Sequence, residues 1–149
     1  MKVVLDTNII VSALMSPDNA CREVLRMAFD GRLRPLIGNA LFAEYESVLA
    51  RDYLFHGCPF DADKRNMFLD DVLSVCSWVE IHYLWRPNLR DEGDNHVLEL
   101  ALSGGAEVVI TQNLKDFRAG DLQMMNHIRF LHPRECLALV REEKLSWQH

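Results

Sequence analysis

The segment Lys2-Val3-Val4-Leu5-Asp6-Thr7-Asn8 decides the fold class of this chain. Its first four residues form a short apolar and β-branched run, which is typical of a buried strand, and the run ends abruptly in three polar residues. The same pattern returns at 107–111, where a second β-branched strand is expected to end before Gln112 and Asn113. Two strands with polar carboxyl ends are therefore expected.

Short apolar strands alternate with amphipathic helices along the rest of the chain. Apolar spacing and capping residues predict helices over 19–30, 40–51, 61–77, 94–105 and 133–141, and further strands over 36–37, 78–83 and 128–131. Asn39 is expected to cap the helix over 40–51. This alternation predicts an α/β sandwich around a mostly parallel sheet, and the lack of any linker or repeat predicts a single domain over 1–149.

Composition excludes several classes of protein. The chain has 149 residues, of which 49% are hydrophobic, so it can form a core and is not predicted to be disordered. It has no run of roughly 18 apolar residues and no signal-peptide pattern, which predicts a cytoplasmic protein without a membrane span. The formal net charge of −6 argues against an indiscriminate coat for nucleic acid but leaves room for a local basic rim. The four separated cysteines are expected to be free and mostly buried.

Candidate catalytic acids lie at the ends of the two predicted strands. In an open parallel sheet, ligands gather beyond the carboxyl ends of the strands, where Asp6 and the Asn113 to Asp116 region are expected. Acids that converge on one cleft repel each other, and either protonation or a bound cation relieves this repulsion. A metal site is the expected resolution.

Further acids are separated by helical geometry. In the helix over 40–51, Glu44 is expected to border the buried stripe, whereas Glu46 is expected to point outward. Asp91 and Asp94 belong to the cluster DEGDN, and crowded oxygen ligands of this kind select Mg²⁺ or Mn²⁺. Helix capping alone could explain Asp91, which is expected at most to support the ligands from outside.

Other chemistries have less support. His96 is expected to be a surface imidazole rather than a ligand, and His56 with Cys58 is the only near pair that could bind zinc. The chain contains no GxxxxGK[ST], GxGxxG or GxSxG motif. A phosphatase that uses Asp6 as its nucleophile would need a second acid at position 8, where the chain has asparagine.

Four segments in order resemble one known family. The segments are LDTN followed by IIVSAL, the helical Glu in LFAEYESVL, DEGDNHVLELAL, and GGAEVVITQNLKDF. Together they resemble PIN-domain ribonucleases, and the most similar subgroup is the bacterial and archaeal PIN proteins classed as toxins of toxin–antitoxin pairs. The resemblance extends from Met1 to about Arg141.

The resemblance implies a three-layer α/β/α fold with a cleft that cuts RNA with Mg²⁺ or Mn²⁺. By position, it implies metal-binding catalytic acids at Asp6, Glu44, Asp94 and Asp116, and supporting polar residues at Thr7, Asn8 and Thr111. Asn113 stands where many members have an acid, so it keeps an oxygen ligand but removes a charge that a second metal would use. The resemblance also implies an RNA substrate, a small antitoxin partner and a homodimer. The alternatives are a PIN-like module that binds RNA or a protein without cutting, and a phosphatase or phospho-acceptor domain.

Overall fold

A parallel sheet of five short strands organises the described part of the chain. The computed structural model describes residues 1–16, 19–81, 95–117 and 128–147. The strands are β1 (Lys2–Leu5), β2 (Arg34–Ile37), β3 (Ser77–Trp78), β4 (Val108–Ile110) and β5 (Arg129–Leu131), arranged in the order β3-β2-β1-β4-β5. Every pairing is parallel. The predicted parallel α/β architecture is therefore confirmed.

The strand order reverses direction at β1. The chain first adds β2 and β3 on one side of β1, and then returns to place β4 and β5 on the other side. In open parallel sheets, the crevice outside such a reversal is where ligands bind. The carboxyl ends of β1 and β4 are therefore the place to look for a site.

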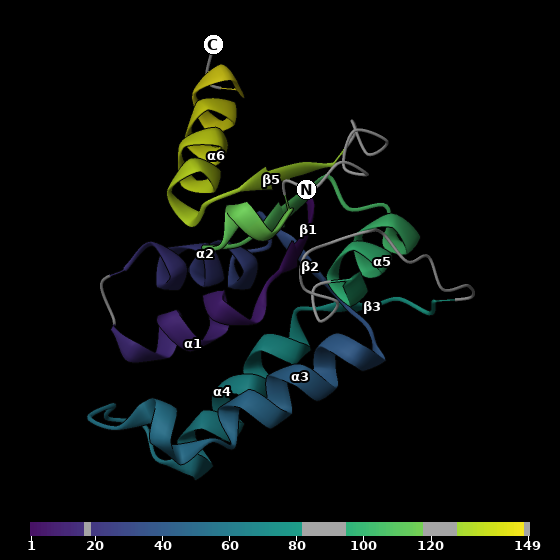
Figure 1. The fold of residues 1–149 in the computed structure, drawn as a ribbon. Helices are drawn as coiled ribbons and strands as arrows, with labels where there is room; N and C mark the ends of the chain where they lie inside the picture. Colours follow the sequence, from purple (N-terminus) through teal and green to yellow (C-terminus); the bar gives the residue numbers. More distant parts are fainter. Residues whose placement is uncertain (17–18, 82–94, 118–127, 148–149) are drawn as a thin grey trace.

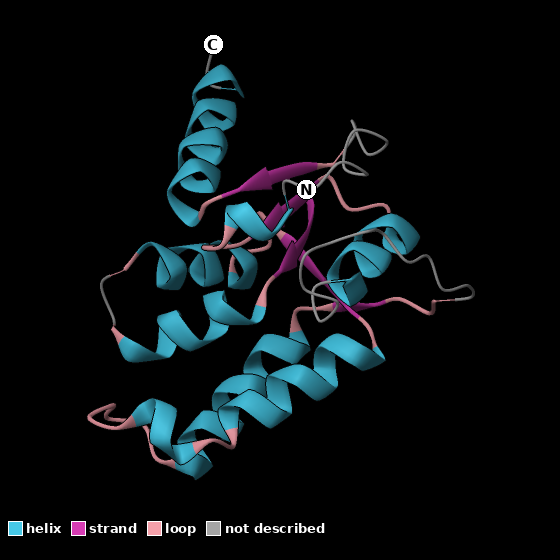
Figure 2. Ribbon diagram, viewed as in Figure 1, coloured by secondary structure: helices cyan, strands magenta, loops and turns pink. Residues whose placement is uncertain are grey.

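Helices cover both sides of this sheet (Figures 1 and 2). The α-helices of the described residues are α1 (Thr7–Met15), α2 (Ala20–Phe29), α3 (Asn39–Leu49), α4 (Ala62–Ser74), α5 (Asn95–Gly104) and α6 (Pro133–Trp147), and short 3₁₀ helices form at η1 (Asp52–Phe55) and η3 (Leu114–Phe117). Helix α5 packs against β1, β2 and β4, while α2 packs against α1 and α6. Helix α3 contacts α1, α4 and α5, so it connects the helix pair α1 and α2 with helix α5.

The core explains why the apolar strands form a sheet. Val3, Val4, Ile37 and Val109 come from three neighbouring strands and are fully buried, as is Leu98 of α5, the helix that packs against the same strands. Strands buried on both faces are continuous apolar runs rather than alternating ones. The apolar run from Val3 to Leu5 at the start of the sequence has this pattern.

Several element boundaries differ from those predicted. Helix α3 begins after Gly38, which makes no side-chain cap, so the prediction of Asn39 as the cap is wrong. Helix α4 begins after its N-cap, Asp61, and ends at Ser74, and β3 covers only Ser77–Trp78, so both elements are shorter than predicted. Helix α1 was not predicted, because its run of Ile9, Ile10 and Val11 has the composition of a strand. The predicted start of a helix at Asp94 lies outside the described residues.

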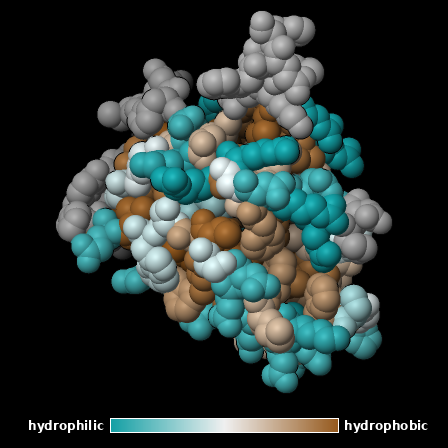
Figure 3. Space-filling model, turned by 180° about the vertical axis from the view of Figure 1, so that it is seen from behind, coloured by the Kyte–Doolittle hydropathy of each residue, from teal (hydrophilic) through white to brown (hydrophobic). Residues whose placement is uncertain are grey.

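Two aromatic side chains, one in α3 and one in η1, contribute to the core. Tyr45 and Phe55 are buried, and Tyr45 donates a hydrogen bond to the Leu5 carbonyl, whereas the Tyr53 side chain is exposed. On the face seen in Figure 3, hydrophobic areas are interrupted by hydrophilic side chains. Tyr45 and Phe55 therefore belong to the core rather than to an apolar surface. No helix in the described ranges is long and apolar enough to cross a membrane.

Gly104 provides a test of the packing between α5 and the sheet. A Cβ at this position would lie 2.6 Å from Leu36 Cδ1 and 2.9 Å from Val79 Cγ2, so a side chain would have to displace both. We expect Gly104→Ala to destabilise the fold by about 1–2 kcal/mol, because overpacking outweighs the higher helix propensity of alanine. Urea denaturation measures this difference. Ser103→Ala in the same helix is the control and should change stability by less than about 0.5 kcal/mol; an unchanged or raised midpoint for Gly104→Ala would contradict the packing described.

Candidate metal centre

Asp6 and Thr111 meet at the carboxyl ends of the two strands that flank the reversal. Leu5 of β1 pairs with Ile110 of β4, so the next residue of each strand lies at the same level. The Asp6 N–H donates to the Ile110 carbonyl at 3.0 Å, and the Thr111 hydroxyl donates to Asp6 Oδ2 at 2.7 Å. Strand register therefore places this carboxylate.

Asn8 connects the two loops that follow β1 and β4. Its Nδ2 donates to Asp6 Oδ2 at 3.2 Å and to Thr111 Oγ1 at 3.3 Å, while its Oδ1 accepts from the Gln112 N–H at 3.2 Å. The Asn113 N–H donates to Thr111 Oγ1 at 3.0 Å, whereas the Asn113 side chain is exposed. The amide and hydroxyl groups therefore hold Asp6 in one orientation.

The Asp6 carboxylate is buried, and its surroundings disfavour its charged form. Only 7% of the residue is exposed, and its Oδ1 accepts from the Thr7 N–H at 2.8 Å as the N-cap of α1. Burial raises the pKa of Asp6, and the negative charge of Glu44 raises it further, although the bonds from Thr111 and Thr7 and the proximity of His96 oppose this. A cation beside Asp6 would remove most of that penalty.

Glu44 lies across from Asp6 on α3 and is held by a histidine. His96 Nε2 and Glu44 Oε2 are 2.6 Å apart, and the two side chains are 20% and 37% exposed, respectively. The hydrogen bond from His96 is the main cause that lowers the pKa of Glu44, and it outweighs the opposing effect of burial. Glu44 therefore stays charged beside the buried Asp6, whereas Glu46 is exposed as predicted.

The expectation that His96 is a surface imidazole is wrong. Its side chain is mostly buried between α5 and α3, and it is the polar contact that joins these helices at Glu44. Sequence spacing did not reveal this contact, because positions 44 and 96 come together only through the packing of α3 on α5. The one available signal was its place in the first turn of a helix directly after an acidic cluster.

Two buried polar atoms at the site have unused bonding capacity. Thr7 Oγ1 and His96 Nδ1 have no hydrogen-bond partner among the residues that the structure describes. The Thr7 hydroxyl is near enough to lower the pKa of Glu44 but makes no hydrogen bond of normal geometry with it. The Thr7 hydroxyl is a hard oxygen donor with spare capacity next to two carboxylates, and such a donor set fits Mg²⁺ or Mn²⁺.

The remaining predicted acids are only partly located. Asp116 belongs to η3, which follows β4, and Asp91 and Asp94 lie outside the described residues. Within the described ranges, no three His, Cys, Asp or Glu side chains are grouped closely enough to hold a metal ion. Asp6 and Glu44 therefore form one part of the candidate centre, and the roles of Asp94 and Asp116 stay predictions.

A zinc site at His56 and Cys58 finds no support in the geometry. The Cys58 thiol donates to the Leu14 carbonyl at 3.3 Å, which makes it a packing group rather than a metal ligand. All four cysteines are free, and Cys21 and Cys136 are buried, as expected for small apolar residues.

Comparison with known proteins identifies the family of this chain. The family model described as "PIN domain" matches residues 2–115 and includes Asp6, Glu44 and Thr111. The chain therefore belongs to the PIN-domain family. No curated protein sequence matches it.

A solved structure supports the same fold. The crystal structure of VapBC2 from Rickettsia felis bound to a DNA fragment from their promoter is similar to this chain with a TM-score of 0.57. The similarity covers 89% of this chain and 98% of the other, at 16% sequence identity. At this identity, the match shows a shared fold.

The penalty on Asp6 predicts an unusual response to mutation. Because the folded-state pKa of Asp6 lies above its unfolded value, the charged carboxylate lowers stability at neutral pH, and this loss disappears as the pH falls through the folded pKa. Asp6→Asn should therefore melt no lower than wild type in EDTA at pH 7, and the two melting temperatures should converge as the pH falls. Asparagine also preserves the helix cap. A drop of more than roughly 5 °C, about 1–2 kcal/mol for this chain length, would show that Asp6 is structural instead.

Proposed function

We propose that this chain is a divalent-metal-dependent endoribonuclease that hydrolyses RNA phosphodiester bonds and serves as the toxin of a toxin–antitoxin pair. The observation that carries the proposal is the buried Asp6 carboxylate, held rigidly at the strand reversal while the charge of Glu44 opposes its ionisation. Membership of the PIN-domain family supports the nuclease class.

The proposed metal ligands are Asp6, Glu44, Asp94 and Asp116, and the ion is Mg²⁺ or Mn²⁺. Thr7, Asn8 and Thr111 would orient these ligands, while Asp91 and Asn113 would act from the edge of the site. The oxygen donors and the unused Thr7 hydroxyl support this choice of ion over zinc.

The protein groups prepare the site for hydrolysis. When bound, a divalent ion lowers the pKa of a water molecule and neutralises charge on the phosphoryl oxygens. Thr111 and Asn8 fix the Asp6 oxygens by hydrogen bonds, so this ligand does not have to be ordered when substrate arrives. His96 fixes Glu44 in the same way from the opposite wall. Both carboxylates are therefore preorganised.

The biological setting is proposed on similarity. The resemblance to toxin-like PIN proteins supports a small antitoxin partner, a homodimer and a cytoplasmic location. The shared fold with a VapBC2 complex agrees with the toxin–antitoxin setting. We also propose that residues 1–149 form a single PIN-like domain, which agrees with a family match over 2–115 followed by β5 and α6 in the same sheet and layer.

Asn113 supports a second candidate function. Its exposed amide replaces a charge at the carboxyl end of β4, so metal affinity could be too low for cleavage. The chain would then bind RNA or a partner protein without cutting. Binding without products would identify this case.

Metal binding can be tested without measuring activity. A ligand that binds only the folded state at 100 times its dissociation constant stabilises it by about 2.7 kcal/mol. Mn²⁺ should therefore raise the melting temperature of wild type by several degrees, and Asp6→Asn and Glu44→Gln should lose this rise. Glu46→Gln, two residues further along α3, is the matched control and should keep it. An equal rise in all four proteins would place the metal elsewhere.

Cleavage tests the function itself. Wild type with Mn²⁺ or Mg²⁺ should cut single-stranded RNA, and EDTA should abolish the products. Asp6→Asn and Asp94→Asn should reduce the rate by at least about 100-fold, because each removes a charged metal ligand, whereas Glu46→Gln should cut normally. Fluorescent RNA and DNA oligonucleotides resolved on a gel measure this. Full activity in the two aspartate variants would reject the proposed centre.

A further inference from the structure

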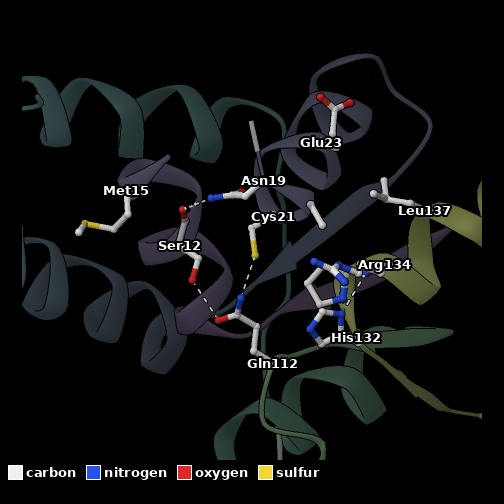
Figure 4. Close-up of a pocket in the computed structure, with 11 residues that line it drawn as sticks. Ser12, Met15, Asn19, Cys21, Glu23, Gln112, His132, Arg134 and Leu137 are labelled. Atoms are coloured by element: carbon white, nitrogen blue, oxygen red, sulfur yellow. Dashed lines mark hydrogen bonds between the residues drawn. The ribbon is translucent and has the colours of Figure 1, made fainter. Parts of the chain in front are cut away.

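A polar cavity lies beside the candidate metal centre. Its volume is about 870 Å³, which suits a ligand of nucleotide size (Figure 4). Gln112 follows β4, His132 follows β5, and Ser12 and Met15 belong to the helix that follows β1. Three neighbouring parallel strands therefore direct their carboxyl ends toward this cavity, where the fold favours ligands.

The cavity and the candidate metal centre share a wall. The Gln112 N–H donates to Asn8 Oδ1, and Asn8 in turn donates to Asp6. Ser12 lies one helical turn after Asn8 on α1, so both side chains are on the same face of that helix. An RNA strand bound over Asp6 could therefore continue directly into the cavity.

Gln112 presents an amide in a fixed orientation. Ser12 Oγ donates to its Oε1 at 3.0 Å, and its Nε2 donates to the Cys21 sulfur at 3.3 Å (Figure 4). Each of the two amide atoms keeps one further bonding position, since a carboxamide oxygen has two lone pairs and its nitrogen has two hydrogens. A donor and an acceptor held side by side match the edge of a nucleobase.

The opposite wall supplies hydrogen-bond donors for an anion. The Arg134 N–H donates to His132 Nδ1 at 3.2 Å, which leaves His132 Nε2 as the ring nitrogen available to a ligand. Arg134 itself is exposed in the first turn of α6, whereas the neighbouring Glu135 carboxylate accepts from the His132 N–H at 3.1 Å. The one carboxylate among the lining residues, Glu23, is paired with Arg26.

Apolar side chains complete the cavity. Met15 is 43% exposed on one side, and Leu137 is buried on the other. Thioether and aliphatic surfaces can cover the face of a base, while the polar groups bind its edge and its phosphate. This combination of an apolar surface, an oriented amide and the cationic Arg134 favours a nucleotide over a small inorganic anion.

We propose that this cavity binds one nucleotide of the RNA strand adjacent to the phosphate that is cut. Arg134 and His132 contact the phosphate of that nucleotide, and Gln112 contacts its base. The proposal rests on the proposed function for the nature of the strand. It adds a binding site, and therefore a source of sequence preference, outside the four acids.

The test measures RNA affinity in EDTA, so that neither cleavage nor metal binding is required. Fluorescence anisotropy with labelled ten-nucleotide oligomers of A, C, G or U, at several salt concentrations, compares wild type with Arg134→Ala and Gln112→Ala. Arg34→Ala is the matched control, because it removes an exposed arginine at the amino end of β2, whereas the cavity lies at the carboxyl ends of the strands. Thermal melting checks that each variant is folded.

The two variants should fail in different ways. Arg134→Ala should weaken binding of every oligomer by about fivefold to tenfold, and should lower the slope of log affinity against log salt by about 0.7, because one phosphate contact is lost. Gln112→Ala should leave the slope unchanged and weaken one oligomer at least about threefold more than the others. Arg34→Ala should match wild type.

Failure of this proposal and failure of the proposed function are distinguishable. Equal affinities for all variants, or equal losses for Arg134→Ala and Arg34→Ala, would overturn the nucleotide site even if wild type cuts RNA with Mn²⁺. The expected losses without any cleavage would support the nucleotide site and reject the nuclease.

Discussion

The pairing of Leu5 with Ile110 is the constraint on which the rest of the site depends. It brings Asp6 and Thr111 to the same level, although 105 positions separate them in the chain. A shift of one residue would turn the Asp6 side chain toward the other face of the sheet. The apolar runs of β1 and β4 are fully buried, so a shift would also expose core residues. Core packing therefore enforces the geometry of the candidate centre.

The site combines two carboxylates whose surroundings shift their pKa values in opposite directions. Burial raises the pKa of Asp6, whereas His96 lowers the pKa of Glu44. The fold keeps this arrangement because hydrogen bonds from Thr111, Asn8 and the α1 backbone support Asp6. Natural proteins maintain such costly arrangements where function requires them. This support comes from α1 and from the residue that follows β4, so it does not depend on one contact.

The sequence predicted the architecture better than it predicted the contacts. The apolar runs of β1 and β4 identified a parallel sheet, because burial on both faces leaves a clear pattern. Helix α1 was missed, because tertiary packing and the Asp6 cap outweighed the strand preference of Ile9 and Ile10. His96 was misjudged for a similar reason, since its partner on α3 is 52 positions away and no local pattern links the two.

The limits of the site prediction have the same origin. The structure brings Asp6 together with Thr111 and Glu44, whereas their role in a site stays a prediction. Asp6 was expected at a strand end and Glu44 beside a cleft from the pattern of their elements, while Thr111 was expected only from the family resemblance. The cavity at Gln112 was not expected, because it needs the loops after β1, β4 and β5 at once. Periodicity reports which face of an element is buried, but it does not report which loops meet.

Asp6 is both the N-cap of α1 and the centre of the proposed charge cluster, and this double role restricts how the position can drift. Serine, threonine or asparagine could still begin the helix after the acid was lost, whereas an aliphatic residue would leave the first turn uncapped. Relatives that keep this fold without the acid would therefore be expected to carry a small polar residue here. Such a residue would preserve the start of the helix while removing the carboxylate of the proposed centre.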